Sequence, residues 1–252
     1  VVGEGTVFGN GSLYRFNSIG SRPRGMIFYR CQNVRIKGIT FRDLATWTCY
    51  LKECRDVVVS GVTVDSHANM NSDGLDIESQ NVLVENCNID SGDDGICLKS
   101  DNPDFCVTNV LVRNCSVRTP CTALKLGTAS HGGFKDIRFE NCTVARPRRA
   151  VRMPCADLPF WGYERMCSSP GFVFDGPPTP PVPGIGIENV DGGCFGDIRF
   201  SDINIDECLV PLFVRMGERR HRKFETSEIH IPFGRNPDLS GVLISDVKAH
   251  AL

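Results

Sequence analysis

Hydrophobic and polar residues alternate in short stretches along the chain, and one nine-residue pattern of them occurs seven times without gaps. The second, fourth, seventh and ninth positions of this pattern are almost always apolar, and the sixth position holds only Gly, Asn or Asp. The seven segments begin at Asn33, Asp56, Asn81, Asn109, Asp136, Asp197 and Gly241. Each segment therefore predicts a strand with alternating burial, a bend at the sixth position and a second short strand.

The intervals between the segments indicate how these units stack. The starts are separated by 23, 25, 28, 27, 61 and 44 residues, and a period of roughly 20–30 β-rich residues is typical of a solenoid. A leucine-rich horseshoe would show a helical leucine pattern, which the chain lacks, so the pattern favours a parallel β-helix, an all-β fold. Equivalent positions of successive coils would then form ladders spaced by about 4.8 Å. Each of the first four intervals fits one coil of roughly 23–28 residues, and we expect each of the last two to span two coils with insertions.

The composition changes at residues 154–186, where many Pro, Gly and aromatic residues interrupt the repeat. Such a segment predicts a long loop inserted into a single β-helix domain that spans residues 1–252. The loop could wall one end of a cleft, with Trp161 or Tyr163 stacking on a sugar. Alternatively, it could pack on the side of the β-helix.

The overall composition says little about partners. The net charge of −2 points to no class of partner by itself, and the hydrophobic content of 41% fits a soluble globular protein. No apolar run is long enough to span a membrane and no signal peptide is visible, so we expect no membrane partner. The basic run at residues 217–225 has few interleaved aromatic residues, which favours a solvated turn over a nucleic-acid site.

Thirteen cysteines are many for this length, but their positions argue against a disulfide scaffold. Three cysteines fill the seventh position of the repeat, which holds Ile or Val in the other segments, and two recur just before the first position. We therefore expect these five to be buried free thiols. These are Cys31, Cys54, Cys87, Cys115 and Cys142. Cys155 and Cys167 lie in the irregular segment and are the better candidates for a disulfide. Metal binding by cysteine is not expected, because no paired C-x-x-C spacing occurs.

Aspartates beside glycine occur on two consecutive coils, in "NSDGLD" (71–76) and "SGDDGICLKS" (91–100). Both motifs introduce a further strand, and aligning such strands gives a second ladder. Its successive members are Asp73, Asp94, Thr122 and Arg149. Asp93 falls one residue earlier, above Ser72 and below Cys121. We therefore expect Asp73, Asp93 and Asp94 to form one patch.

Three carboxylates in one patch repel one another, so at least one of their pKa values should rise. A protonated carboxylic acid beside an ionised carboxylate is suited to glycoside hydrolysis, in which one group protonates the departing oxygen and another draws a proton from water. Aspartates also begin β-helix strands simply as turn formers. Two Asp-Gly frames in register, one of them doubled, favour the catalytic interpretation.

The same two motifs resemble the Asn-Thr-Asp-Gly-x-Asp and Asp-Asp segments of the polygalacturonase family, glycoside hydrolase family 28. The resemblance covers most of residues 1–153 and returns in "GGCFGDIRFSDINID". It implies a single-stranded, right-handed parallel β-helix that hydrolyses pectic polysaccharide with inversion and without a metal or other cofactor. Family members usually extend further at both ends, so we expect residues 1–252 to be a truncated form of the family fold, or another domain or chain to cover the open edge.

The resemblance also implies roles for individual residues. Asp93 would be the general acid, and Asp73 and Asp94 would hold and activate the attacking water. Asn71 would support this geometry as a substrate-site residue.

The chain departs from the family pattern at two places. The family usually has Gly-His-Gly on the next coil, but "PCTALKLGT" places Cys121 or Thr122 in the histidine position. The Arg-x-Lys motif is incomplete, because Pro154 stands where lysine is expected after Arg152.

Nearby cations are therefore candidates for binding an acidic sugar, since Lys and Arg side chains suit uronate carboxylates. The predicted substrate-binding residues of this kind are Lys99, Lys125, Arg149 and Arg152.

Taken together, the residues and the resemblance predict an inverting glycoside hydrolase that acts on a pectin-type, uronate-containing polysaccharide, of the polygalacturonase or rhamnogalacturonan hydrolase kind. Such an enzyme would be secreted or periplasmic. A Ca²⁺-dependent polysaccharide lyase and a non-catalytic carbohydrate-binding β-helix are the alternatives.

Overall fold

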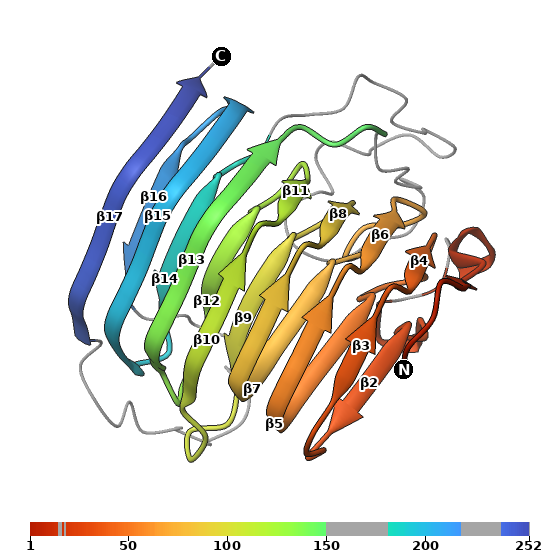
Figure 1. The fold of residues 1–252 in the computed structure, drawn as a ribbon, viewed down its shortest axis with the longest axis horizontal. Coiled ribbons are helices and arrows are strands. Elements are labelled where there is room, and N and C mark those ends of the chain that lie inside the picture. The colour runs from red at the N-terminus through yellow and green to blue at the C-terminus, as the bar shows by residue number, and fades with distance from the viewer. Residues whose placement is uncertain (15–16, 18, 150–180, 218–237, 252) are drawn as a thin grey trace, which may run out of the picture.

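The structure is a computed structural model that describes residues 1–14, 17, 19–149, 181–217 and 238–251. Its strands stack from β2 near the N-terminus to β17 at the C-terminus (Figure 1), and every strand pairing in these residues is parallel. The predicted parallel β-helix is thus confirmed. Two short 3₁₀-helices, Gly11–Tyr14 and Ile19–Ser21, follow β1.

The strands form three ladders, which we call faces A, B and C, and each coil passes through them in that order. Face A contains β2 (Met26–Tyr29), the first parts of β5 (Cys49–Ser60) and β7 (Leu75–Glu85), β9 (Ile96–Ser100), β12 (Leu124–Ser130), β14 (Ile185–Asn189) and β16 (Leu212–Met216). Face B contains β3 (Arg35–Lys37), the second parts of β5 and β7, β10 (Val107–Arg113), and the first parts of β13 (Phe134–Ala145), β15 (Cys194–Cys208) and β17 (Asp238–Ala251). Face C contains β1 (Thr6–Phe8), β4 (Thr40–Arg42), β6 (Thr63–Ser66), β8 (Asn88–Ser91), β11 (Ser116–Arg118) and the second parts of β13, β15 and β17.

Both turn positions of the nine-residue pattern adopt the left-handed backbone conformation. All seven residues at the first position and all seven at the sixth have φ between 49° and 72°. Most side chains are disfavoured in that region, whereas Gly, Asn and Asp tolerate it. This explains why these three residue types fill both positions, and it confirms the predicted bend.

The two long intervals of the repeat were interpreted wrongly. β13 pairs directly with β15, with Ile137 opposite Ile198, and β15 pairs directly with β17, with Ile198 opposite Val242. Each interval therefore spans one coil rather than two. β14 begins at Ile185, so regular structure also resumes before the end of the predicted loop, 154–186.

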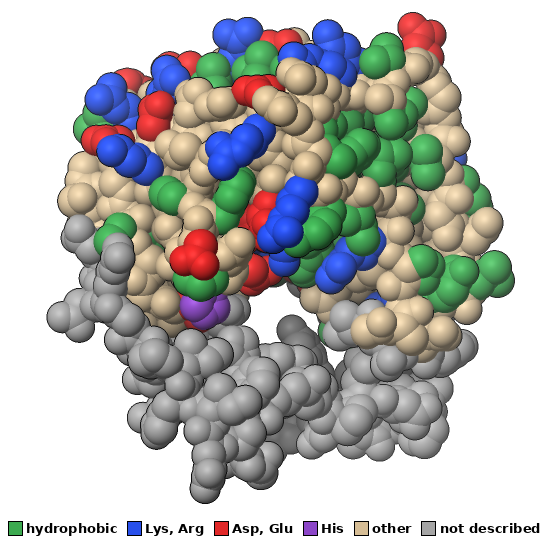
Figure 2. Space-filling model, turned by 90° about the horizontal axis from the view of Figure 1, so that it is seen from below, with side chains coloured by type: hydrophobic (Ala, Val, Ile, Leu, Met, Phe, Trp, Pro, Cys, Tyr) green, Lys and Arg blue, Asp and Glu red, His purple; other side chains and the backbone are tan. Residues whose placement is uncertain are grey.

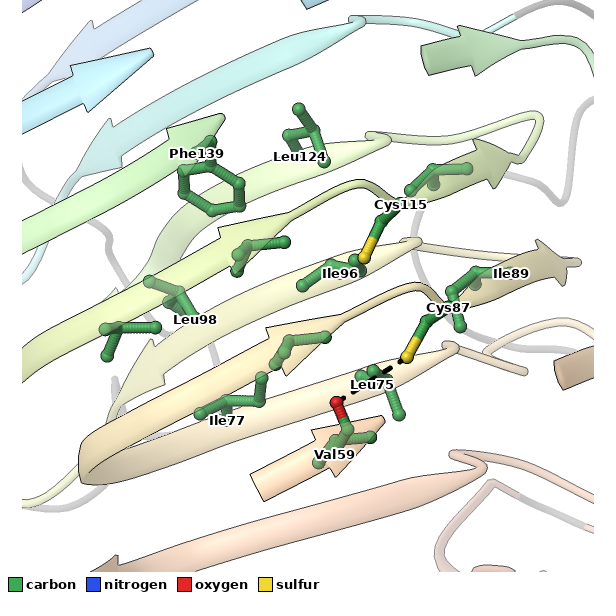
Figure 3. Close-up of a cluster of buried hydrophobic side chains, with 14 of the residues drawn as sticks. Val59, Leu75, Ile77, Cys87, Ile89, Ile96, Leu98, Cys115, Leu124 and Phe139 are labelled. Carbon is green, nitrogen blue, oxygen red and sulfur yellow. Dashed lines mark hydrogen bonds between the residues drawn. The ribbon is translucent and has the colours of Figure 1, made fainter. Parts of the chain in front are cut away.

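The interior is a continuous apolar column built from the inward residues of all three faces. Cys87 and Cys115 lie among Leu, Ile and Val side chains there (Figure 3), and Phe139 stacks on Phe200 with ring centroids 4.8 Å apart. The prediction of buried free thiols holds for four of the five cysteines, whereas Cys31 is only partly buried. Cys155 and Cys167 lie outside the described residues.

Charged side chains of both signs lie on the face seen from below Figure 1. Lys and Arg side chains lie there among Asp and Glu side chains (Figure 2). Within the described ranges, no helix has the length and apolar character needed to cross a membrane.

Candidate active site

The predicted acidic patch forms at the corner where face C turns into face A. Leu75 pairs with Ile96, which sets Asp73 opposite Asp94 on consecutive rungs. The Gly74 N–H donates to the Asp94 carbonyl oxygen at 2.9 Å, and this bond fixes the register at the aspartates themselves. The expected vertical alignment of the two motifs is confirmed.

The glycines beside the aspartates are required by the close approach of neighbouring rungs. A Cβ atom on Gly74 would lie 2.5 Å from the Gly95 carbonyl oxygen, and one on Gly95 would lie 2.6 Å from the Ala123 carbonyl oxygen. Real Cβ atoms do not approach an oxygen so closely. The Asp-Gly frame therefore lets three successive coils stack tightly beneath the carboxylates.

We expect Gly95→Ala to destabilise the protein by about 1–3 kcal/mol, because the added methyl group forces the Ala123 rung or the Val117 side chain to shift. Gly196→Ala is the matched control, because its Cβ would meet only Ser240 Oγ at 3.7 Å. Thermal unfolding followed by circular dichroism measures both variants. Equal melting temperatures for the two would contradict the tight stacking at Gly95.

Asp93 is held by backbone groups on two sides. Its Oδ2 accepts from the Asn71 N–H at 3.2 Å and its Oδ1 accepts from the Asp94 N–H at 2.8 Å. Burial and the neighbouring Asp94 carboxylate nevertheless raise the pKa of Asp93 above its usual value. Asp93 is thus a positioned carboxyl group that favours the protonated form. Asn71, predicted to support the site, does so through its backbone.

Asp94 has the opposite tendency. Burial opposes its ionisation, but the ammonium groups of Lys125 and Lys99 outweigh this effect and lower the pKa of Asp94. Lys125 Nζ lies 3.0 Å from Asp94 Oδ2, and the Thr122 N–H donates weakly to Oδ1 at 3.4 Å. The adjacent aspartates therefore favour different protonation states.

Asp73 lies one rung below and is paired with a buried lysine. Lys99 Nζ is 3.5 Å from Asp73 Oδ2 and 3.1 Å from Asp76 Oδ1. Burial, together with the charges of Asp76, Asp93 and Asp94, raises the pKa of Asp73 well above its usual value. Burial also raises the pKa of Asp76 to about 6 against the opposing effect of Lys99.

Asp76 was not predicted as a site residue. It stands three residues after Asp73 on face A, and its carboxylate shares Lys99 with Asp73. The second aspartate of "NSDGLD" was the available signal, because an acidic residue at the start of a buried strand needs a partner.

Cys121 occupies the corner in place of the expected histidine. Its sulfur and one oxygen each of Asp93 and Asp94 lie within 4.8 Å of one another. Burial, followed by the charges of the two aspartates, raises the pKa of the Cys121 thiol, so it stays protonated and can donate a weak S–H hydrogen bond. This set supplies fewer oxygen ligands than Ca²⁺ takes, and Asp94 is already paired with Lys125. These residues therefore do not suit a calcium ion.

The predicted stacking of Arg149 above Thr122 is wrong. Leu124 pairs with Ile185, so Pro183 rather than Arg149 follows Thr122 on the ladder. The Arg149 guanidinium instead contacts Asp43 at 3.1 Å and Asp65 at 2.5 Å, beside face C. Arg152 lies outside the described residues, and its predicted role in substrate binding stays a prediction.

A cavity of about 280 Å³ adjoins the acidic corner on its C-terminal side. Its lining comes from three rungs: Cys121, Thr122, Lys125, Val182, Pro183, Glu188, Val210 and Phe213. Lys125 Nζ lies 3.5 Å from Glu188 Oε1 as well as near Asp94, so two carboxylates compensate its charge. The wall formed by Val182, Pro183, Val210 and Phe213 is apolar.

Comparison with known proteins assigns this parallel β-helix, with its buried acidic corner, to a family of glycosyl hydrolases. Residues 1–156 match the model of glycosyl hydrolases family 28. The chain belongs to this family.

Individual relatives agree with the family assignment. A probable polygalacturonase of Arabidopsis thaliana is 27% identical over 186 residues, which cover 71% of this chain and 39% of the relative. The chain thus spans less than half the length of this relative.

Solved structures of family members share the fold. An exopolygalacturonase from Thermotoga maritima matches with a TM-score of 0.56 at 19% identity, covering 90% of this chain and 44% of that chain. An endopolygalacturonase from Stereum purpureum, complexed with two galacturonates, matches with a TM-score of 0.50 at 15% identity, covering 98% and 77%.

Proposed function

We propose that the chain carries the catalytic centre of an inverting glycoside hydrolase that cleaves a pectin-type, uronate-containing polysaccharide. The observation that carries this proposal is the carboxyl cluster itself: Asp73 stacks on Asp94 on consecutive rungs, and Asp93 beside them is held by the backbone N–H groups of Asn71 and Asp94. The pKa of Asp93 is raised and that of Asp94 is lowered, so the two groups suit the acid and the base that glycosidic cleavage needs. A pectic substrate is supported by the family match and by the relative named as a probable polygalacturonase.

Asp93 acts as the general acid in this proposal. Its proton passes to the glycosidic oxygen as the bond to the anomeric carbon breaks. The two backbone N–H groups on its carboxyl oxygens fix the direction of the remaining O–H and stabilise the carboxylate that forms. The raised pKa keeps the proton on Asp93 up to a higher pH than on an ordinary aspartate.

Asp94 and Asp73 hold the attacking water. Asp94 is ionised beside Lys125. It accepts a proton from the water while the water oxygen attacks the anomeric carbon. Asp73, buried beside Lys99 and with a raised pKa, orients the water as a hydrogen-bond partner. This division refines the predicted pair of activating residues into one base and one positioning group.

Release of reducing ends from homogalacturonan and rhamnogalacturonan by the purified chain tests the proposal. A hydrolase releases reducing ends without ultraviolet absorption, and proton NMR of the first-formed anomer reports inversion. An unsaturated, ultraviolet-absorbing product that is abolished by a chelator would instead identify a lyase. Binding without any cleavage would identify a carbohydrate-binding β-helix. The proposal includes a secreted or periplasmic location, where such polymers are accessible.

A further inference from the structure

The ladder that carries the aspartates continues toward the N-terminus beyond the predicted site. Met26 pairs with Cys49, and Cys49 pairs with Leu75. The same register places Arg24 opposite Trp47 and Trp47 opposite Asp73. Arg24 is therefore two rungs before Asp73 on one corner of the β-helix, about 10 Å along the axis.

Arg24 is held on the aromatic rings of this corner. Its guanidinium carbon lies 4.4 Å from the ring centroid of Trp47 and 5.6 Å from that of Tyr50, and the two rings meet edge to face at 5.2 Å. Lys99 Nζ lies 4.6 Å from the Trp47 centroid and 3.5 Å from Asp73. Trp47 therefore joins the Arg24 guanidinium to the acidic cluster through direct contacts.

The charges of the other nearby lysines are already compensated. Lys52 pairs with Glu78 at 3.9 Å, Lys99 pairs with two aspartates, and Lys125 pairs with Asp94 and Glu188. Arg24 is exposed, and among the residues that the structure describes no carboxylate pairs with it. Its planar edge of N–H donors is thus available to a ligand, while ring contact limits its conformational freedom.

The opposite side of the acidic corner has a different character. The cavity beyond Cys121 has an apolar wall, and Glu188 on its lining would repel an anionic sugar.

We propose that Arg24, stacked on Trp47, binds the carboxylate of a uronate residue on the N-terminal side of the cleavage point. The inference rests on the proposed function, because it takes the aspartate cluster as the place where the polysaccharide is cut. The uronate carboxylate accepts two parallel hydrogen bonds from the guanidinium, and Trp47 keeps the guanidinium plane in place. The site selects for a free carboxylate over its methyl ester.

Calorimetric binding of trigalacturonate and of its fully methyl-esterified form tests this site, with every variant in an Asp93→Asn background so that cleavage is slow. Arg24→Gln is expected to weaken binding of the acid about tenfold and to change binding of the ester less than twofold. Arg24→Lys should give an intermediate loss, because it keeps the charge but not the paired donors. Arg199→Gln removes an exposed arginine from face B and should change neither affinity.

Three results would overturn the proposal. The first is an equal loss of affinity for the acid and the ester in Arg24→Gln, and the second is an affinity of Arg24→Gln equal to that of Arg199→Gln. The third is that neither ligand binds before Arg24 is changed. Cleavage by the wild-type chain is measured separately by reducing ends. Cleavage without a selective effect of Arg24→Gln rejects only the uronate site. Selective binding without cleavage by the wild-type chain rejects only the hydrolase assignment.

Discussion

Asp93→Asn is expected to lower kcat on the cleaved pectic substrate by about a thousandfold, since general acid catalysis typically contributes 10²–10⁴-fold. The amide keeps the size of the side chain and one oxygen to accept a backbone N–H, but it has no proton to give to the leaving oxygen. Burial and Asp94 raise the pKa of Asp93, so replacing it also relieves repulsion in the cluster. The amide nevertheless leaves one of the two backbone N–H groups on residue 93 without an acceptor, so thermal unfolding of the variant is measured alongside kcat.

The pH profile gives this prediction a second readout. Wild-type activity should fall as pH rises through the raised pKa of Asp93, because the acid is then deprotonated, and it should fall at low pH as Asp94 takes up a proton. The residual activity of Asp93→Asn should lack the alkaline decline. Asp104→Asn, in an exposed loop, is the matched control and should leave both kcat and the profile unchanged. A decrease of less than tenfold in kcat for Asp93→Asn would assign the proton donor to another group.

The fold could be predicted from the sequence because its repeat obeys a strict backbone requirement. The left-handed turns at Asn33 and Gly38 recur on later coils. Because only a few residue types tolerate this conformation, the turn positions can be recognised in the sequence by residue type. The ladder through Asp73 and Asp94 followed from the same register, since stacking rungs place equivalent positions above one another.

The predicted stacking of Arg149 above Thr122 was wrong because the number of residues between successive rungs varies. An interval of 61 residues fits either two short coils or one coil with a long insertion, and the choice depends on which strands form hydrogen bonds. The apolar pattern before Pro154 resembles a face A strand, yet Ile185 takes that place. No local feature of the sequence decides between these two pairings.

Trp47 and Arg24 were missed for a different reason. Their positions follow from extending the Asp73 ladder by two rungs toward the N-terminus, which needs only the strand register. Neither residue lies in a recurring motif, so the signal was positional rather than chemical. Side-chain partners such as the Lys99 ammonium above the Trp47 ring could be read only from the structure.

Lys99→Met is expected to reduce the free energy of unfolding by about 3–5 kcal/mol near pH 7, the usual cost of removing one partner from a buried ion pair. Lys99 is buried, and it is the cation closest to both Asp73 and Asp76. Without it, two buried carboxylates must either remain charged without compensation or take up protons. Denaturation by urea measures the loss, and Lys135→Met is the control, since this lysine is exposed and forms no ion pair among the described residues, so its loss should cost less than about 1 kcal/mol.

The sign of the pH dependence separates this mechanism from simple loss of packing. Asp73 and Asp76 have raised pKa values in the folded protein, about 6 for Asp76, so the folded state binds their protons more tightly than the unfolded state does. The resulting stabilisation is present below the ordinary aspartate pKa of about 4 and is lost as pH rises through the folded value. Removing Lys99 raises the pKa values of Asp73 and Asp76 in the folded protein further. The folded protein therefore keeps losing stability up to a higher pH.

The difference between wild type and Lys99→Met should consequently be larger at pH 8 than at pH 5, by about 1.4 kcal/mol for each unit by which a pKa rises between these limits. Adding Asp76→Asn to Lys99→Met should recover part of the stability at pH 8, because it removes one of the two uncompensated charges. A loss that is the same at both pH values, with no recovery in the double variant, would show that Lys99 contributes through its packing against Trp47 and not through its charge.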